Sequence, residues 1–224
     1  MLVRTDWVPV SAAMLLTGAL ALCLGGFLLP SSDNGSESLR IVQEQSGQWM
    51  TAAVVLFLAS VFMTLGLPAV LTMFEHRGWG LALVSAVVLE VGFIGTAGFA
   101  MLMAFFRSLV LTDAIRDKNI DEIASEAGIA VFLYAWIVGL YLGELLLGIA
   151  LLRAGTAPRW IPFALILHAL IAPFSGTLPE YLSKATVLLL VEPPRRVRRL
   201  SSLRLQRLLG SGGERSERPR PRPA

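Results

Sequence analysis

The sequence predicts an all-α protein, a polytopic transmembrane helix bundle with about six spans. Six apolar stretches, separated by short charged connections, make up most of the chain up to Val191. Hydrocarbon about 30 Å thick takes roughly 20 apolar residues to cross as a helix, and the first four stretches are that long. Hydrophobic residues make up 55% of the 224 residues, which exceeds the usual share in soluble domains.

Two apolar runs, 7–30 and 49–74, contain no charged residue, and two more, 79–106 and 128–152, contain one acid each. We expect each run to form one membrane-spanning helix. The first run is too long for the apolar core of a cleaved signal peptide and has no clear cleavage site, so we assign it as the first span. Indole rings favour the membrane interface, and four tryptophans lie at predicted span ends: Trp7, Trp49, Trp79 and Trp160.

Polar segments connect these runs. Residues 30–48 are rich in turn-forming and acidic side chains and predict a polar loop outside the lipid. Residues 75–78 and 153–159 are short enough for tight connections. Residues 107–126 predict a longer acidic loop, with helix expected around 113–127.

The last apolar stretch, residues 160–191, predicts a hairpin. Its 32 residues would form a helix about 48 Å long, and prolines, a glycine and charged residues interrupt it. The halves, 160–175 and 177–191, are each only about 22 to 24 Å as helices. We therefore expect either two short spans or a re-entrant hairpin, and both return the chain to the side on which it entered.

The basic tail sets the predicted orientation. Ten of the 19 Lys and Arg residues follow Pro194, and basic residues near span ends favour the cytoplasmic side. The other basic residues near predicted spans divide equally, four to each side. We therefore expect a multi-pass protein of the cell membrane with both termini cytoplasmic, divided into a transmembrane bundle (1–192), a basic juxtamembrane segment (193–209) and a disordered Pro/Arg-rich tail (210–224).

The juxtamembrane segment is expected to lie on anionic lipid headgroups, at about 1 kcal/mol per basic residue. Nucleic acid is not an expected partner, because no aromatic side chain in this segment could stack on bases. The predicted headgroup contacts are Arg195, Arg196, Arg198 and Arg199.

Ionisable residues on four predicted helices share one depth in the membrane. Counted from the cytoplasmic end of each span at 1.5 Å per residue, Glu90 lies about 16 Å deep, Glu144 about 13 Å, His168 about 12 Å and Lys184 about 10 Å. Such residues are costly in hydrocarbon and usually find partners. We therefore expect a common intramembrane polar layer, with Tyr141 placed to hydrogen-bond Glu144 or a neighbour.

This layer has two interpretations. A carboxyl group that exchanges a proton with His168 would form a proton path or cation site, whereas pairing that only fixes helix register is worth about 1 kcal/mol or less. We predict no metal site, because no second histidine lies at ligand spacing. We also predict no haem or other cofactor, since His76 lies at the surface and His168 deeper. Cys23 is the only cysteine.

Glycines and prolines indicate where helices pack or break. Gly139 and Gly143 form a GxxxG pattern on the side of their helix away from Glu144, and Gly92 and Gly95 lie on the side of theirs away from Glu90; both pairs permit close helix approach. Pro68 removes the hydrogen bond to the Thr64 carbonyl and should kink its helix. Pro173 has the same effect near His168.

The sequence does not state a biochemical role. It contains no nucleotide-binding, hydrolase or paired-cysteine motif, so we expect a non-enzymatic accessory or structural membrane component. The alternative is a small transporter or proton-coupled carrier that uses Glu90, Glu144 and His168. Besides the lipid bilayer, a membrane-protein partner or a second copy of the chain remains open.

Overall fold

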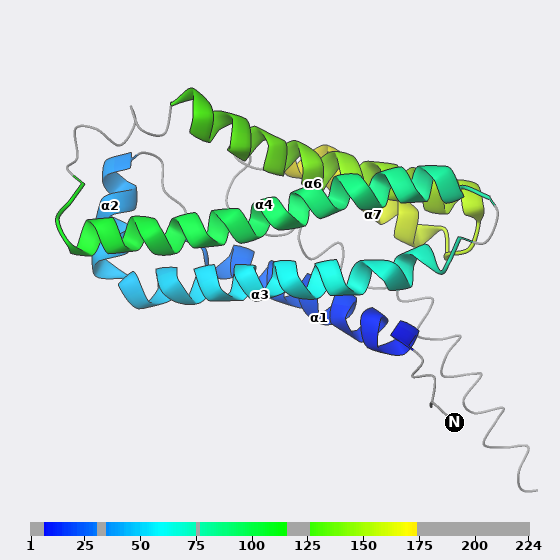
Figure 1. The fold of residues 1–224 in the computed structure, drawn as a ribbon, viewed down its shortest axis with the longest axis horizontal. Coiled ribbons are helices and arrows are strands. Elements are labelled where there is room, and N and C mark those ends of the chain that lie inside the picture. The colour runs from blue at the N-terminus through cyan, green and yellow to red at the C-terminus, as the bar shows by residue number, and fades with distance from the viewer. Residues whose placement is uncertain (1–6, 31–34, 75–76, 116–125, 174–224) are drawn as a thin grey trace, which may run out of the picture. The chain divides into compact units, whose positions relative to one another are not determined.

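The computed structural model describes residues 7–30, 35–74, 77–115 and 126–173 (Figure 1). All of them belong to one compact unit, Met1–Leu190. Within these ranges the chain is helical and contains no strand, which confirms the all-α prediction there. The helices are α1 (Trp7–Leu28), α2 (Gly35–Glu44), α3 (Ser46–Leu71), α4 (Trp79–Leu111), α6 (Ala127–Ala154) and α7 (Trp160–Ile171).

Four of these helices, α1, α3, α4 and α6, are long and apolar enough to cross a membrane. They coincide with the first four predicted runs and contain 22, 26, 33 and 28 residues. At 1.5 Å per residue, α4 is about 50 Å long, which is longer than the hydrocarbon is thick. These four apolar helices indicate a membrane location.

The helix that opens the predicted hairpin is much shorter. α7 has 12 residues, about 18 Å, which is too short to cross the hydrocarbon by itself. The second half of the predicted hairpin, 177–191, lies outside the described residues. The structure therefore supports four candidate spans, and the expected total of six stays a prediction.

The predicted loop at 30–48 is wrong for residues 35–44, which form α2, and for residues 46–48, which begin α3. Helix α2 is amphipathic: Ile41 and Val42 are buried, whereas Arg40 and Glu44 are exposed and approach to 3.9 Å. It contacts both α3 and α4. The sequence did not indicate this apolar face, because a short helix packs through only a few hydrophobic side chains, and here they stand among polar residues.

The predicted loop at 107–126 also begins too early, because α4 continues to Leu111. The last turns of α4 form hydrogen bonds with the start of α3. Arg107 donates from Nε to the Ser46 carbonyl oxygen at 3.1 Å and to Ser46 Oγ at 2.8 Å. One turn deeper, Trp49 Nε1 donates to the Met103 carbonyl oxygen at 3.0 Å. These contacts stabilise α4 beyond its apolar run.

Neighbouring helices pack in chain order, α1 on α3, α3 on α4, α4 on α6 and α6 on α7 (Figure 1). Glycines bring α1 and α3 into backbone contact. A Cβ at Gly66 would lie 2.5 Å from the Leu15 backbone, and one at Gly18 would lie 2.8 Å from the Met63 nitrogen. Close approach through small residues is typical of membrane helices, where lipid supplies no hydrophobic drive for association.

Candidate functional site: two acids at one level of the bundle

Glu144 of α6 forms a close pair with His168 of α7. The two carboxylate oxygens lie 2.9 and 2.8 Å from His168 Nδ1, and the side chains are only 11% and 15% exposed. The carboxylate and the imidazole nitrogen thus share a hydrogen bond, whose donor depends on the His168 tautomer. The pair therefore joins α6 and α7 through a part-buried hydrogen bond.

Gly148, one turn after Glu144, allows α7 to come this close. A Cβ at that position would lie 2.7 Å from Ile166 Cγ1 and 3.1 Å from the Pro162 carbonyl oxygen. The two helices are antiparallel here, because a later residue of α6 meets earlier residues of α7. The lack of a side chain at position 148 thus positions His168 opposite the carboxylate.

Tyr141 lies beside the imidazole of this pair. Its ring centroid is 6.1 Å from that of His168, with an angle of 55° between the ring planes. Among the described residues, the hydroxyl group makes no hydrogen bond to Glu144, whose oxygens both face Nδ1. Tyr141 therefore contacts the pair through its ring.

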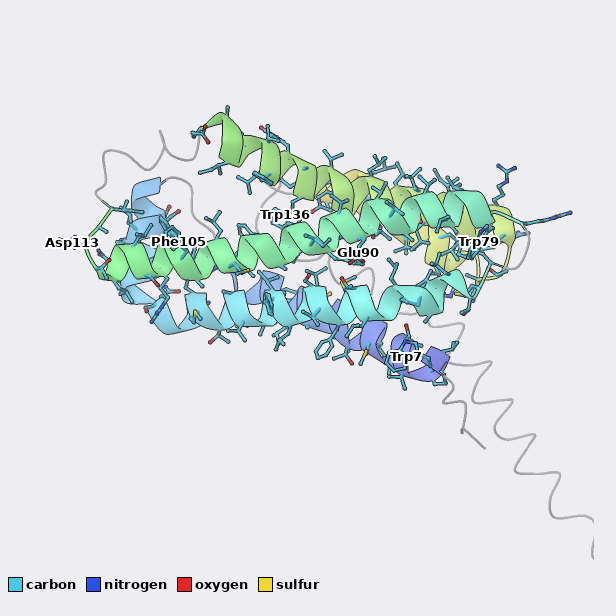
Figure 2. All side chains as sticks on the ribbon, in the orientation of Figure 1. Trp7, Trp79, Glu90, Phe105, Asp113 and Trp136 are labelled. Carbon is cyan, nitrogen blue, oxygen red and sulfur yellow. The ribbon has the colours of Figure 1, made fainter. Side chains whose placement is uncertain are left out.

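Glu90 has a different partner. Its Oε1 accepts a hydrogen bond from Thr64 Oγ1 at 2.9 Å, so the acid on α4 is bonded to α3. Figure 2 shows Glu90 on the side of α4 that faces α3. The sequence did not identify Thr64 as a partner, because a threonine in an apolar helix commonly bonds its own backbone.

The two acids lie at the same level of the bundle but on different faces of their helices. Leu89 and Gly143 meet where α4 packs on α6, with a Cβ at Gly143 placed 2.7 Å from the Leu89 nitrogen. Each acid is the next residue along its helix, turned about 100° away. Within the described part of the chain, no hydrogen bond joins the two pairs. The layer thus consists of two separate pairs.

A third polar contact surrounds Pro68. Ser11 of α1 is fully buried, and its Oγ donates to the Leu65 carbonyl oxygen at 2.8 Å, with Gly66 O at 3.1 Å. The same oxygen accepts from the Ala69 amide at 3.2 Å. In an unbroken helix that amide would bond to the Leu65 carbonyl directly. The serine hydroxyl therefore bonds to both the carbonyl and the amide of the turn that contains the proline.

The predicted packing glycines all lie between α4 and α6. A Cβ at Gly92 would lie 2.6 Å from the Leu140 nitrogen, and one at Gly139 would lie 3.0 Å from the Gly92 nitrogen. A Cβ at Gly95 would lie 2.6 Å from Trp136 Cβ. The main chains therefore touch along this line, which fixes the levels of Glu90 and Glu144 relative to each other.

Trp136 adds an aromatic contact to the interface between α4 and α6. Trp136 Nε1 donates to Thr96 Oγ1 at 2.9 Å, and the Trp136 ring stacks on Phe99 with centroids 4.6 Å apart. Figure 2 shows Trp136 between α6 and α4. Sequence reasoning did not single out Trp136, because a tryptophan in the middle of a span gives no boundary signal.

Some predicted residues lie outside the described residues: Lys184, Arg195, Arg196, Arg198 and Arg199. Among those the structure describes, no three His, Cys, Asp or Glu side chains come together as a metal would require. Every fully buried side-chain nitrogen or oxygen in the same ranges has a hydrogen-bond partner.

Comparison with known proteins assigns this chain to no family. No protein-family model, curated protein or solved structure matches the chain. What the chain does must therefore be inferred from its own residues and their geometry.

Proposed function

We propose that this chain is a multi-pass integral membrane protein of the cell membrane, with both termini cytoplasmic, and that it acts as a non-enzymatic accessory or structural component. One observation supports this most directly. Several polar side chains inside the candidate spans, Ser11, Thr64 and Glu144 among them, bond to a neighbouring helix. Every fully buried polar side-chain atom of the described residues has a partner. Such a pattern specifies how helices pack.

Three of these contacts join three different pairs of neighbouring helices. Ser11 joins α1 to α3, Thr64 joins α3 to Glu90 of α4, and Glu144 joins α6 to His168 of α7. Together with the glycine contacts, these bonds set the order and depth of the helices. A framework of this kind is suited to presenting a fixed membrane-embedded surface to a partner.

The alternative is a proton-coupled carrier. It is favoured by one observation, the Glu144–His168 pair, because both side chains bind protons and they share a hydrogen bond at mid-span. Intramembrane ionisable residues commonly mark proton relays. This alternative requires protons to reach and leave the pair during transport, whereas the accessory role requires only that the pair holds α7 on α6.

Proton flux distinguishes the two roles. The purified chain is reconstituted in proteoliposomes containing a pH-sensitive dye, and a valinomycin-induced potassium potential drives protons inward. We expect flux no greater than in empty liposomes. We also expect Glu144→Gln and Glu90→Gln to insert normally and to lower the free energy of unfolding by about 1 kcal/mol each.

Glu44→Gln is the matched control, because Glu44 lies on α2 and its side chain is 60% exposed. Its stability should equal that of the native chain. Proton flux in the native chain that Glu144→Gln abolishes and Glu44→Gln retains would reject the accessory role in favour of the carrier.

A further inference from the structure

The two ends of the bundle differ in charge. At the end where α3 and α6 finish and α4 and α7 begin, the charged residues that the structure describes are three exposed arginines, Arg77, Arg153 and Arg159. At the opposite end, two arginines lie among four acids. Those described residues are Arg40, Arg107, Glu37, Glu44, Asp113 and Glu126. Within the described ranges, one end is therefore purely cationic and the other has an excess of acids.

The three arginines at the cationic end surround one small apolar cluster, formed by buried residues at the ends of α3 and α6 and at the start of α4. Gly78, directly after Arg77, lies against α6, where a Cβ at that position would come within 3.2 Å of the Ala150 carbonyl oxygen. The residue directly after Arg153 and the residue two positions after Arg159 also pack against this cluster. We call these three arginines the arginine rim.

No group of the described residues neutralises the arginine rim. None of its three guanidinium groups takes part in an ion pair or a hydrogen bond there. The two described arginines at the opposite end are both engaged, because Arg40 lies 3.9 Å from Glu44 and Arg107 bonds to Ser46. The charge of the rim is therefore free to attract a partner outside the chain.

The arginine rim lies where lipid headgroups are expected. Trp79 follows Arg77 by two residues and Trp160 directly follows Arg159, and indole rings favour the membrane interface. Figure 2 shows Trp79 at this end of α4. Helix α6 is a candidate span that stays apolar up to the residue before Arg153. A long arginine side chain at this level can lay its stem on apolar surface and hold its charged group among the headgroups.

We propose that the arginine rim binds anionic phospholipids through their headgroup phosphates. A guanidinium group matches a phosphate in shape and charge, since it can donate two parallel hydrogen bonds. A lipid is the fitting partner because the rim stands at the edge of the apolar spans, where these headgroups are concentrated. The surface requires a membrane location but neither the accessory role nor the proposed orientation, so its failure would leave the proton-flux result unchanged.

Lipid preference of the purified chain tests the proposal. The tail arginines are expected to bind the same lipids, so the parent protein is the full chain with alanine at six tail positions. It is incubated in nonionic detergent with equal amounts of dioleoylphosphatidylglycerol and dioleoylphosphatidylcholine, and native mass spectrometry counts the molecules of each lipid that it retains. We expect the parent to retain mainly phosphatidylglycerol. The six positions are Arg195, Arg196, Arg198, Arg199, Arg204 and Arg207.

Variants of the parent separate the arginine rim from positive charge in general. Arg153→Gln should lower the preference for phosphatidylglycerol about 5-fold, the effect of one basic residue near an anionic surface. Substitution of all three rim arginines by glutamine should lower it further. Arg40→Gln is the charge-matched control, because Arg40 lies beside Glu44 at the acidic end, and it should leave the preference unchanged. Circular dichroism checks that each variant keeps its helical content.

Three results would overturn the proposal. The first is a parent protein that retains the two lipids equally. The second is an Arg40→Gln variant that loses as much of the preference as Arg153→Gln. The third is a triple rim variant that is folded and keeps the full preference of the parent.

Discussion

The hydroxyl group of Ser11 lies inside a gap in the backbone hydrogen bonds of α3. Pro68 has no amide hydrogen, and its ring crowds the preceding turn, so the helix cannot close its bonds at this point. Ser11 donates to the Leu65 carbonyl and accepts from the Ala69 amide. One side chain from α1 thus bonds to a carbonyl and an amide of α3 beside the proline, as where a polar group inserts into a helix.

We expect Ser11→Ala to lower the free energy of unfolding by about 1 to 3 kcal/mol, because it removes the serine's hydrogen bonds to the part-buried Leu65 carbonyl and the buried Ala69 amide. Unfolding in mixed SDS micelles measures this loss. Thr17→Ala is the control on the same helix, since Thr17 is exposed and its hydroxyl group bonds only to Ala13 of its own helix. Its effect should be close to zero.

The proline provides a second check on the same bridge. In a Pro68→Ala background the amide of residue 68 returns and α3 can close its bonds, so the loss caused by Ser11→Ala should shrink. If Ser11→Ala lowers the free energy of unfolding as much with alanine at position 68 as with proline, the Ser11 hydroxyl group does not compensate for the proline.

Counting along helices indicated part of the candidate site. Depth alone placed Glu144 and His168 at one level, and the structure joins them. It also placed Glu90 at that level, but its partner is Thr64. Depth does not determine which helix an acid faces. The order of the helices decides that, and no single apolar run encodes it.

At the scale of elements, the α4–α6 contact depends on residues without side chains. Gly92 and Gly139 bring the two main chains together, and the adjacent Trp136–Thr96 bond forms only at that separation. Van der Waals contact of this kind drives association in lipid. A single methyl group in the contact must therefore force the helices apart.

We expect Gly92→Ala to destabilise the protein by about 1 to 3 kcal/mol, the usual cost of overpacking, because its Cβ would lie 2.6 Å from the Leu140 nitrogen. Gly98→Ala is the matched control on the same helix, where a Cβ would meet nothing within 4 Å. It should be neutral or slightly stabilising, since alanine favours helix over glycine. Equal unfolding free energies for the two variants would show that the contact is not close-packed.

The sequence predicted best the helices that correspond to long apolar runs. Each of the four apolar runs corresponds to one helix because about 20 apolar residues have few other structures available in lipid. The signal for α2 was short: its buried residues, Ile41 and Val42, lie among polar ones. A helix of that length is stabilised by its contacts with α3 and α4, which sequence patterns do not show.

At the scale of the whole molecule, orientation depends on few charges. The described spans alternate in direction, so α2 and the end of α4 share one side, while the start of α4 and the end of α6 share the other. The eight basic residues that flank the first four spans and α7 divide equally between these sides, four to each. The proposed cytoplasmic termini therefore rest on the arginines that follow Pro194.

Single cysteines in a Cys23→Ser background test this orientation. We expect a membrane-impermeant maleimide added to intact cells to label Gln43→Cys and Thr112→Cys, and to label Arg77→Cys and Thr156→Cys only after permeabilisation. All four positions are exposed. Labelling of the second pair in intact cells, with protection of the first, would reverse the proposed orientation.

The same assay measures what the tail contributes. We expect alanine at six tail positions to produce mixed insertion, with Thr156→Cys labelled from outside in up to about half of the molecules, because the remaining charges near the spans no longer favour either side. Substitution of Arg215, Arg218, Arg220 and Arg222, which lie farther from the spans, is the control and should leave labelling unchanged. If the first span alone sets the direction of insertion, labelling will not respond to the six substitutions either. The six tail positions changed to alanine are Arg195, Arg196, Arg198, Arg199, Arg204 and Arg207.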